Sequence, residues 1–164
     1  MELVDILNCR KELTGNVCDK KEVPDHYYRL SIHVWIINDD GQLLIQQRSS
    51  NLKRFPNKWT NTGGAAQAGE KSIDTVVREV KEELNLNVDV NKLEFIASYK
   101  RDKDYVDVWV LRQNAKISDL KLQSEEVQDV KWCTLEEWLK LVDDGEGIKS
   151  STDYLKKYLE KDFY

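Results

Sequence analysis

Residues 63–86 read GGAAQAGEKSIDTVVREVKEELNL. The segment joins two adjacent glycines to an acidic stretch with a helical pattern, because apolar residues recur in it at spacings of three and four. These residues are Ile73, Val76, Val77, Val80 and Leu84. We therefore predict a helix from Ser72 to Leu84, whose first turn is capped by Ser72 or by the preceding loop.

Three carboxylates of this helix share one side of it. At about 100° per residue, Glu79, Glu82 and Glu83 fall within an arc of roughly 100°, well away from the apolar stripe. Each neighbouring pair of like charges costs about 0.2–0.5 kcal/mol even in water, so the spacing favours a divalent cation that offsets the repulsion. Arg78 is placed to hold one of the carboxylates through a forked hydrogen bond. The alternative is an ordinary solvated acidic face.

Gly63 and Gly64 stand between a polar loop and the acidic helix. Because they lack a Cβ, they allow a ligand to approach the backbone closely, and an exposed carbonyl of Gly63 is then a further candidate metal ligand. The alternative is a plain tight turn.

The rest of the chain alternates between strand and helix patterns. We predict a short N-terminal hairpin at about residues 3–18, a second hairpin made of strands 30–37 and 42–48, and later strands at 93–100, 105–112 and 127–133. A capping box predicts a helix over 134–142, and a last helix is expected over 152–160. Residues 49–69 read as one long polar loop, which is more often functional than idle. Together, these strands and helices predict a single α/β domain over residues 1–164, with a mixed sheet covered by helices.

Composition limits the possible functions. The chain has 164 residues, 34% of them charged and 40% hydrophobic, with a net charge of −5. This balance excludes fibrous and largely disordered proteins and argues against stable binding of nucleic acid through phosphate contacts alone. No run approaches the roughly 18 apolar residues of a membrane span, and three cysteines without a CxxC motif suit a reducing compartment. We expect a cytoplasmic protein, monomeric or homodimeric, that does not act at a membrane.

One spaced pattern resembles the Nudix box: Gly64-x5-Glu70-x7-Arg78-Glu79-Val80-x-Glu82-Glu83-x-Asn85-Leu86. The family has a glycine where Asn85 stands, at the end of the helix, and asparagine tolerates the left-handed conformation better than most residues. The resemblance implies the Nudix fold, an α/β/α sandwich around a mixed sheet. It also implies hydrolysis of a diphosphate linked to another group, with Mg²⁺ or possibly Mn²⁺ as cofactor.

The same resemblance suggests roles for single residues. Glu82 and Glu83 would be metal ligands, and the Gly63 carbonyl a further one. Glu79 would be a ligand or the base that activates water, oriented by Arg78, and Glu70 would bind metal or support the helix. Glu126, or its neighbour Glu125, is a second candidate for the base, the alternative being a solvated acidic turn.

Nearly the whole chain also looks like isopentenyl-diphosphate isomerase, which shares the Nudix fold but moves a double bond. The similar segments are 30–35, 43–49, 53–61 and 125–133. That enzyme needs a loop cysteine and a histidine-rich metal site. Gly63 stands at the cysteine position and Glu22, Arg29 and Ala65 at histidine positions, while an acidic position of the later strand persists as Asp107. His26 and His33 fall on no ligand position and are expected to be ordinary surface or sheet residues.

Three functions follow as hypotheses. The first is a hydrolase of a nucleoside diphosphate linked to another moiety, with a nucleoside diphosphate itself, a nucleotide sugar or ADP-ribose as the substrate type. The sequence also leaves isoprenoid diphosphates open as substrates. In that case Lys53 and Arg54 would clamp the far phosphate. Trp59 would stack on a base or form the pocket floor, unless it belongs to the core. The alternatives are an isomerase that works without the cysteine and a non-catalytic nucleotide-binding module.

Overall fold

The computed structural model describes residues 1–161 and contains one large mixed sheet. Its strands follow the order β5-β4-β3-β8-β7, with β6 paired to β3 and β9 paired to β4. The only parallel pairing among them joins β3 to β8, within the described part of the chain. The strands are β3 (Arg29–Ile37), β4 (Leu43–Arg48), β5 (Trp59–Thr60), β6 (Thr62–Ala65), β7 (Leu93–Lys100), β8 (Asp104–Arg112) and β9 (Val127–Cys133).

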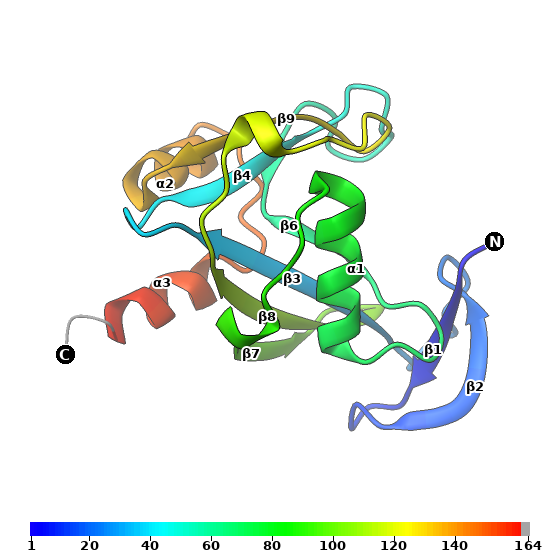
Figure 1. Cartoon of the computed structure of the whole chain (residues 1–164). Helices are drawn as coiled ribbons and strands as arrows, with labels where there is room; N and C mark the ends of the chain where they lie inside the picture. Colours follow the sequence, from blue (N-terminus) through cyan, green and yellow to red (C-terminus); the bar gives the residue numbers. More distant parts are fainter. Residues whose placement is uncertain (162–164) are drawn as a thin grey trace.

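Helices cover both faces of this sheet (Figure 1). Helix α1 (Ser72–Leu84) buries Val76, Val80 and Leu84 against one face. Helices α2 (Leu135–Asp143) and α3 (Thr152–Glu160) pack against the other through Trp138 and Leu155. Two single-turn 3₁₀ helices, η1 (Val90–Lys92) and η2 (Ile117–Asp119), lie in the connections. The predicted α/β/α sandwich around a mixed sheet is therefore confirmed.

The ends of α1 follow from its sequence. The N-cap residue is Lys71 of the preceding loop rather than Ser72, and its backbone N–H donates to the side chain of Asp74, in the first turn of the helix, at 3.1 Å. At the other end Asn85 adopts the left-handed conformation, with φ of 56° and ψ of 36°. Asparagine thus performs the helix-ending role for which glycine is the commonest residue.

The long loop predicted over residues 49–69 is only partly a loop. It contains β5 and β6, two and four residues long, which are too short and too rich in glycine to show strand periodicity in the sequence. Strand β6 pairs antiparallel with β3, so that His33 faces Gly63 and Ile32 faces Gly64. This pairing places the two glycines between the central strand of the sheet and α1.

The N-terminal hairpin forms a small separate sheet from β1 (Leu3–Leu7) and β2 (Leu13–Asp19). Figure 1 shows it beside the N-terminal end of α1. Polar contacts attach it to the main body: the Gly69 N–H donates to Asp5 at 2.8 Å, and Lys11 Nζ bonds Asp107 at 2.6 Å. The segment that connects the hairpin to β3 contains Lys20 and Lys21, and both residues line the pocket described below.

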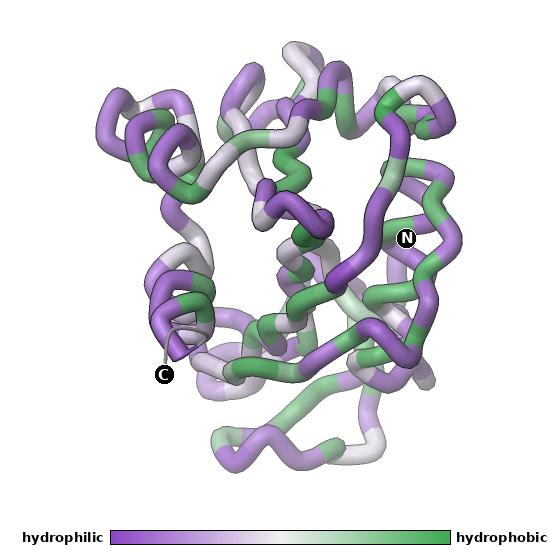
Figure 2. The backbone as a smooth tube through the Cα atoms, turned by 60° about the vertical axis from the view of Figure 1, so that its left-hand side comes forward, coloured by the Kyte–Doolittle hydropathy of each residue, from purple (hydrophilic) through white to green (hydrophobic). Residues whose placement is uncertain are grey.

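The helices are amphipathic. Figure 2 shows hydrophobic and hydrophilic residues alternating along them. Among residues 1–161, none of the helices combines the length and the apolar character that crossing a membrane requires.

Candidate active site

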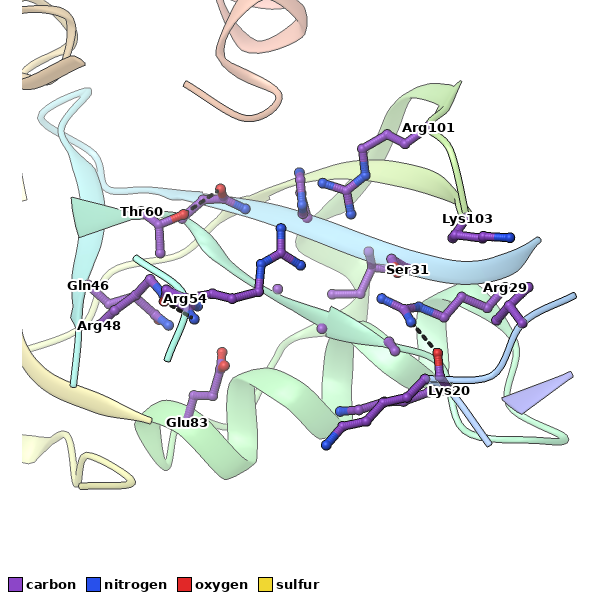
Figure 3. A pocket seen from close by; sticks show the side chains of 18 residues that line it. Lys20, Arg29, Ser31, Gln46, Arg48, Arg54, Thr60, Glu83, Arg101 and Lys103 are labelled. Carbon is purple, nitrogen blue, oxygen red and sulfur yellow. Dashed lines mark hydrogen bonds between the residues drawn. The ribbon is translucent and has the colours of Figure 1, made fainter. Parts of the chain in front are cut away.

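A pocket of about 640 Å³ opens where several parts of the chain meet (Figure 3). Its floor is the paired surface of β3 and β6, with Gly63 and Gly64 at the centre. Helix α1 contributes Glu83 at one side, and the connection after β4 contributes Arg54. The segment between β2 and β3 and the turn between β7 and β8 close the opposite end with basic side chains.

Among the described residues that line the pocket, Glu83 is the only acidic one. Its side chain comes from the last turn of α1 and is buried, with 8% of the residue exposed. Within residues 1–161 its Oε2 atom is buried and has no hydrogen-bond partner. Burial, and after it the neighbouring charge of Glu79, raises the pKa of Glu83 well above its usual range, although hydrogen bonds from Gln46 and the Gly63 N–H act in the opposite direction. A bound cation would relieve the cost of such a buried carboxylate.

The other carboxylates of the box gather around Arg78. Its guanidinium forks onto Glu70, with Nε and Nη2 at 2.7 and 3.0 Å from the two oxygens, and Nη2 also donates to the Ala65 carbonyl. Its Nη1 donates to Glu79 at 3.0 Å and to Glu82 at 3.1 Å. The forked bond expected of Arg78 therefore goes to Glu70.

The helical geometry placed Glu79, Glu82 and Glu83 on one common face, and the structure refines this expectation. Only Glu82 is well exposed, with 46% of its side chain accessible, whereas the Glu79 side chain is 12% accessible and Glu83 is buried. The difference arises because β6 lies against this side of α1, a pairing the sequence did not reveal.

Glu79 lies directly behind the floor of the pocket. A Cβ added to Gly64 would sit 2.4 Å from the Glu79 carboxyl carbon and from its Oε1, so any larger residue at position 64 would displace this carboxylate from its present position. Burial raises the pKa of Glu79 to about 7, against the lowering effect of the Arg78 charge. A carboxyl group with a pKa near neutrality can exchange a proton at physiological pH, which suits a general base.

The donor set fits a hard divalent cation. In residues 1–161 no three acidic, histidine or cysteine side chains converge on one point, because Arg78 lies among Glu70, Glu79 and Glu82. The Oε2 atom of Glu83 nevertheless points into the pocket without a partner, and carboxylate oxygens are the ligands that Mg²⁺ prefers. The residues present are therefore compatible with such an ion at Glu83 and its neighbours.

The predicted substrate residues separate in the structure. Arg54 lines the pocket, whereas Lys53 and Trp59 are not among its lining residues. Trp59 packs against the core on the α2 side, with Lys131 Nζ 4.4 Å from the centre of its ring, as its core alternative anticipated. Glu126 is exposed on the turn before β9, and its charge acts on Glu83.

Sequence reasoning missed most of the positive charge in the pocket. The additional basic side chains come from four separate segments, and they are Lys20, Lys21, Arg29, Arg48, Arg101 and Lys103. The paired lysines 20 and 21 were the local signal, since Arg29 meets Arg101 and Lys103 only through the parallel pairing of β3 with β8, and Arg48 reaches the pocket from the end of β4.

Two further residues have contacts that the sequence did not indicate. His33 is a sheet residue of β3, as expected, but it also lines the pocket, and its Nδ1 lies 3.0 and 3.1 Å from the hydroxyls of Ser150 and Ser151. Burial lowers the pKa of His33 to about 4, so the ring is neutral at physiological pH. Asp107 forms an ion pair with Lys11. Asp104, three residues earlier in β8, is paired in register with the pocket residue Arg29 of β3.

We expect Arg78→Gln to destabilise the fold by about 2–4 kcal/mol, because it leaves Glu70 and Glu79 largely buried without their partner. Thermal or urea unfolding measures the change. Lys81→Gln is the matched control, since it removes one positive charge from an exposed position of the same helix and should change stability by less than about 0.5 kcal/mol. Equal stability of the two variants would show that the Arg78 network does not support the fold.

A mixed sheet held between helices, with a glycine-to-glutamate loop leading into an arginine-centred acidic helix, defines the Nudix class of proteins. The family described as NUDIX domain matches residues 27–153, and the chain belongs to this family. The resemblance to the Nudix box is thereby confirmed.

Similar proteins include both branches that the sequence suggested. An uncharacterised Nudix hydrolase of Listeria monocytogenes is 39% identical over 151 residues, which cover 90% of this chain and 89% of the relative. An isopentenyl-diphosphate Delta-isomerase of Shigella flexneri is 29% identical over 150 residues, covering 87% and 82%. A crystal structure from Deinococcus radiodurans superposes with a TM-score of 0.79 at 25% identity and covers 96% of this chain and 98% of its own. An Ap4A hydrolase of C. elegans superposes with a TM-score of 0.58 at 25% identity, covering 80% and 96%.

Proposed function

We propose that this protein is a metal-dependent hydrolase that cleaves the pyrophosphate bond of a nucleoside diphosphate linked to another moiety. Nucleoside diphosphates, nucleotide sugars and ADP-ribose represent the substrate type. The observation that carries the proposal is the unpartnered, buried Oε2 atom of Glu83 in a pocket whose other charged lining residues, in the described part of the chain, are lysines and arginines. Such a pocket suits an anionic substrate that is bound together with a cation.

Mg²⁺ or Mn²⁺ would be held by Glu83, Glu82, Glu79 and Glu70, with the Gly63 carbonyl as a further candidate. When bound, the ion neutralises phosphate charge and lowers the pKa of coordinated water. Arg78 positions the carboxylates by holding Glu70, Glu79 and Glu82 at 2.7–3.1 Å.

The remaining residues bind the substrate and move the proton. Arg54 and Arg48 supply guanidinium groups for the phosphates, and Arg48 is itself held against the Arg54 carbonyl at 2.9 and 3.0 Å. Glu79 takes a proton from the attacking water, and Glu126 is the second candidate for this base. Water adds to one phosphorus, the bond from that phosphorus to the bridging oxygen breaks, and the other phosphate leaves.

Isomerase chemistry is disfavoured by the floor of the pocket. Glycine occupies position 63, where the isomerase resemblance requires a thiol proton donor. None of Cys9, Cys18 and Cys133 is among the described residues that line the pocket. Conversion of isopentenyl diphosphate without release of phosphate would contradict hydrolysis. Tight nucleotide binding without turnover at any divalent metal would instead identify a binding module.

We expect hydrolysis to require a divalent metal. EDTA should abolish release of phosphorylated products from a panel of nucleoside diphosphates and their derivatives, and Mg²⁺ or Mn²⁺ should restore it. Mass spectrometry of the products in ¹⁸O-labelled water identifies both the substrate and the attacked phosphorus. In parallel, either metal should raise the unfolding temperature of the wild type but not of Glu83→Gln. Full activity in EDTA would overturn the proposed role of the acidic helix.

A further inference from the structure

The pocket carries positive charge at both ends. We call Arg48 and Arg54 the near pair, because Figure 3 shows them on the side of Glu83 and Gln46. Figure 3 shows Lys20, Arg29, Arg101 and Lys103 away from that side, and we call these four residues, together with Lys21, which follows Lys20 in the chain and also lines the pocket, the far cluster. The near pair and a bound divalent cation already provide the charge that a diphosphate requires. The far cluster is therefore in excess, in a chain whose net charge is −5.

Arg29 is the central residue of the far cluster. It is the first residue of β3, and its Nη1 donates to the Lys20 carbonyl at 2.5 Å. Its Nε is buried, and no hydrogen-bond partner for it exists in the part of the chain that the structure describes. A buried donor without a partner costs free energy that an anionic ligand would recover.

Arg101 is held in a fixed orientation beside Arg29. The buried carboxylate of Asp104 accepts from Arg101 Nε at 2.7 Å and from Nη2 at 2.5 Å, and it also accepts from the Ser31 hydroxyl at 2.8 Å. Asp104 is only 3% exposed. A guanidinium anchored in this way has little conformational freedom left to lose, so binding an anion costs it little further entropy.

The carboxylates near the far cluster neutralise only part of its positive charge. Lys20 pairs with Glu2 at 2.8 Å, Lys103 pairs with Asp25 at 2.7 Å, and Arg101 pairs with Asp104. Across residues 1–161, Lys21 and Arg29 form no ion pair with a carboxylate. Two positive charges consequently stay available to a ligand at this end of the pocket.

We propose that the far cluster binds a second phosphate group of the substrate, separate from the diphosphate that is hydrolysed. This inference rests on the proposed function, because it assigns the diphosphate to the end of the pocket at Glu83. It narrows the substrate class to diphosphates in which an organic group attached to the diphosphate, such as the nucleoside, carries an additional phosphate monoester. A longer linear polyphosphate is the other source of the same chemistry.

Binding in the presence of EDTA tests the inference without hydrolysis. Calorimetry compares ADP with adenosine 3′-phosphate 5′-diphosphate, which differs from ADP by one phosphate monoester, and with ATP, which lengthens the phosphate chain instead. We expect the wild type to bind adenosine 3′-phosphate 5′-diphosphate at least about tenfold more tightly than ADP, since charge-assisted hydrogen bonds are the strong ones. A comparable gain for ATP alone would assign the far cluster to a linear polyphosphate and overturn the monoester.

Variants connect the preference to the far cluster. Arg29→Gln should reduce the tenfold ratio to within about twofold while the affinity for ADP is retained, and Arg29→Lys should keep part of the ratio. Lys92→Gln, which removes one positive charge from an exposed residue of η1, should leave the ratio unchanged. Thermal unfolding of each variant verifies that it is folded.

The outcomes separate this inference from the proposed function. Equal affinities of the wild type for the three nucleotides, including no measurable binding to any, would overturn the far cluster as a phosphate site. So would an Arg29→Gln variant that weakens all three ligands equally. Absence of metal-dependent turnover would instead overturn the proposed function, and it would leave a measured binding ratio standing.

Discussion

Glu83→Gln should lower kcat by two to three orders of magnitude, about the loss seen when one group that stabilises transition-state charge is removed. The substituted amide has nearly the same shape, but it presents a poorer ligand to a divalent cation and carries no charge. Stability should respond in the opposite direction. Burial penalises the charged form of Glu83 in the free protein, so the neutral amide should leave the free energy of unfolding unchanged or raise it.

Loss of activity together with retained stability distinguishes a ligand from a structural residue. Phosphate release from the substrate found in the panel gives kcat, and urea unfolding gives stability. Glu136→Gln is the control, since it removes one negative charge from an exposed position of α2 and should leave both quantities unchanged. A Glu83→Gln variant with activity within about threefold of the wild type would remove Glu83 from the proposed mechanism.

Gly64→Ala should lower kcat about a hundredfold with little effect on folding. The new methyl group would sit 2.4 Å from the Glu79 carboxyl carbon, and the end of that side chain can move aside. A displacement of about 1 Å from the productive position costs on the order of a hundredfold in rate. Steady-state hydrolysis and thermal unfolding, measured on the same preparation, test the two parts of this prediction.

Gly63→Ala is the informative comparison. Its new methyl group would lie 2.6 Å from the Ile32 carbonyl oxygen, which is backbone of the central strand and cannot move cheaply. This variant should therefore lose stability, by about 1–3 kcal/mol. In a double-mutant cycle, Gly64→Ala should have a smaller effect in a Glu79→Asp background, because the shorter side chain leaves space. Additive effects would contradict the steric explanation.

The acidic helix and its ends were predictable because they depend on local chemistry. Periodic apolar residues give α1 its bounds, and the tolerance of asparagine for positive φ explains Asn85. The Nudix box then led to the fold, since its spacing is specific. The order of the strands carries no such local signal, and the mixed character of the sheet was expected only in general terms.

The surroundings of the site were much less predictable. Strands β5 and β6 are too short for periodicity, so the burial of Glu79 and Glu83 behind β6 was not foreseen. The basic residues were missed for a different reason. Arg29 and Arg101 lie far apart in the sequence, and they come together beside Asp104 only in the folded protein. Lys53 is adjacent to Arg54 in the sequence but is not among the residues that line the pocket, so neighbouring positions of one loop do not share a location.

The small N-terminal sheet has a consequence for how ligand selectivity could be altered. It precedes residues 27–153, which match the family, and the segment that leaves it carries Lys20 and Lys21 into the pocket wall. The groups proposed to break the bond lie instead on the loop and helix of residues 63–86. Two of the five cations of the far cluster therefore stand on a stretch of polypeptide separate from the proposed hydrolytic segment, and substitutions at these two positions can retune selectivity without touching that segment.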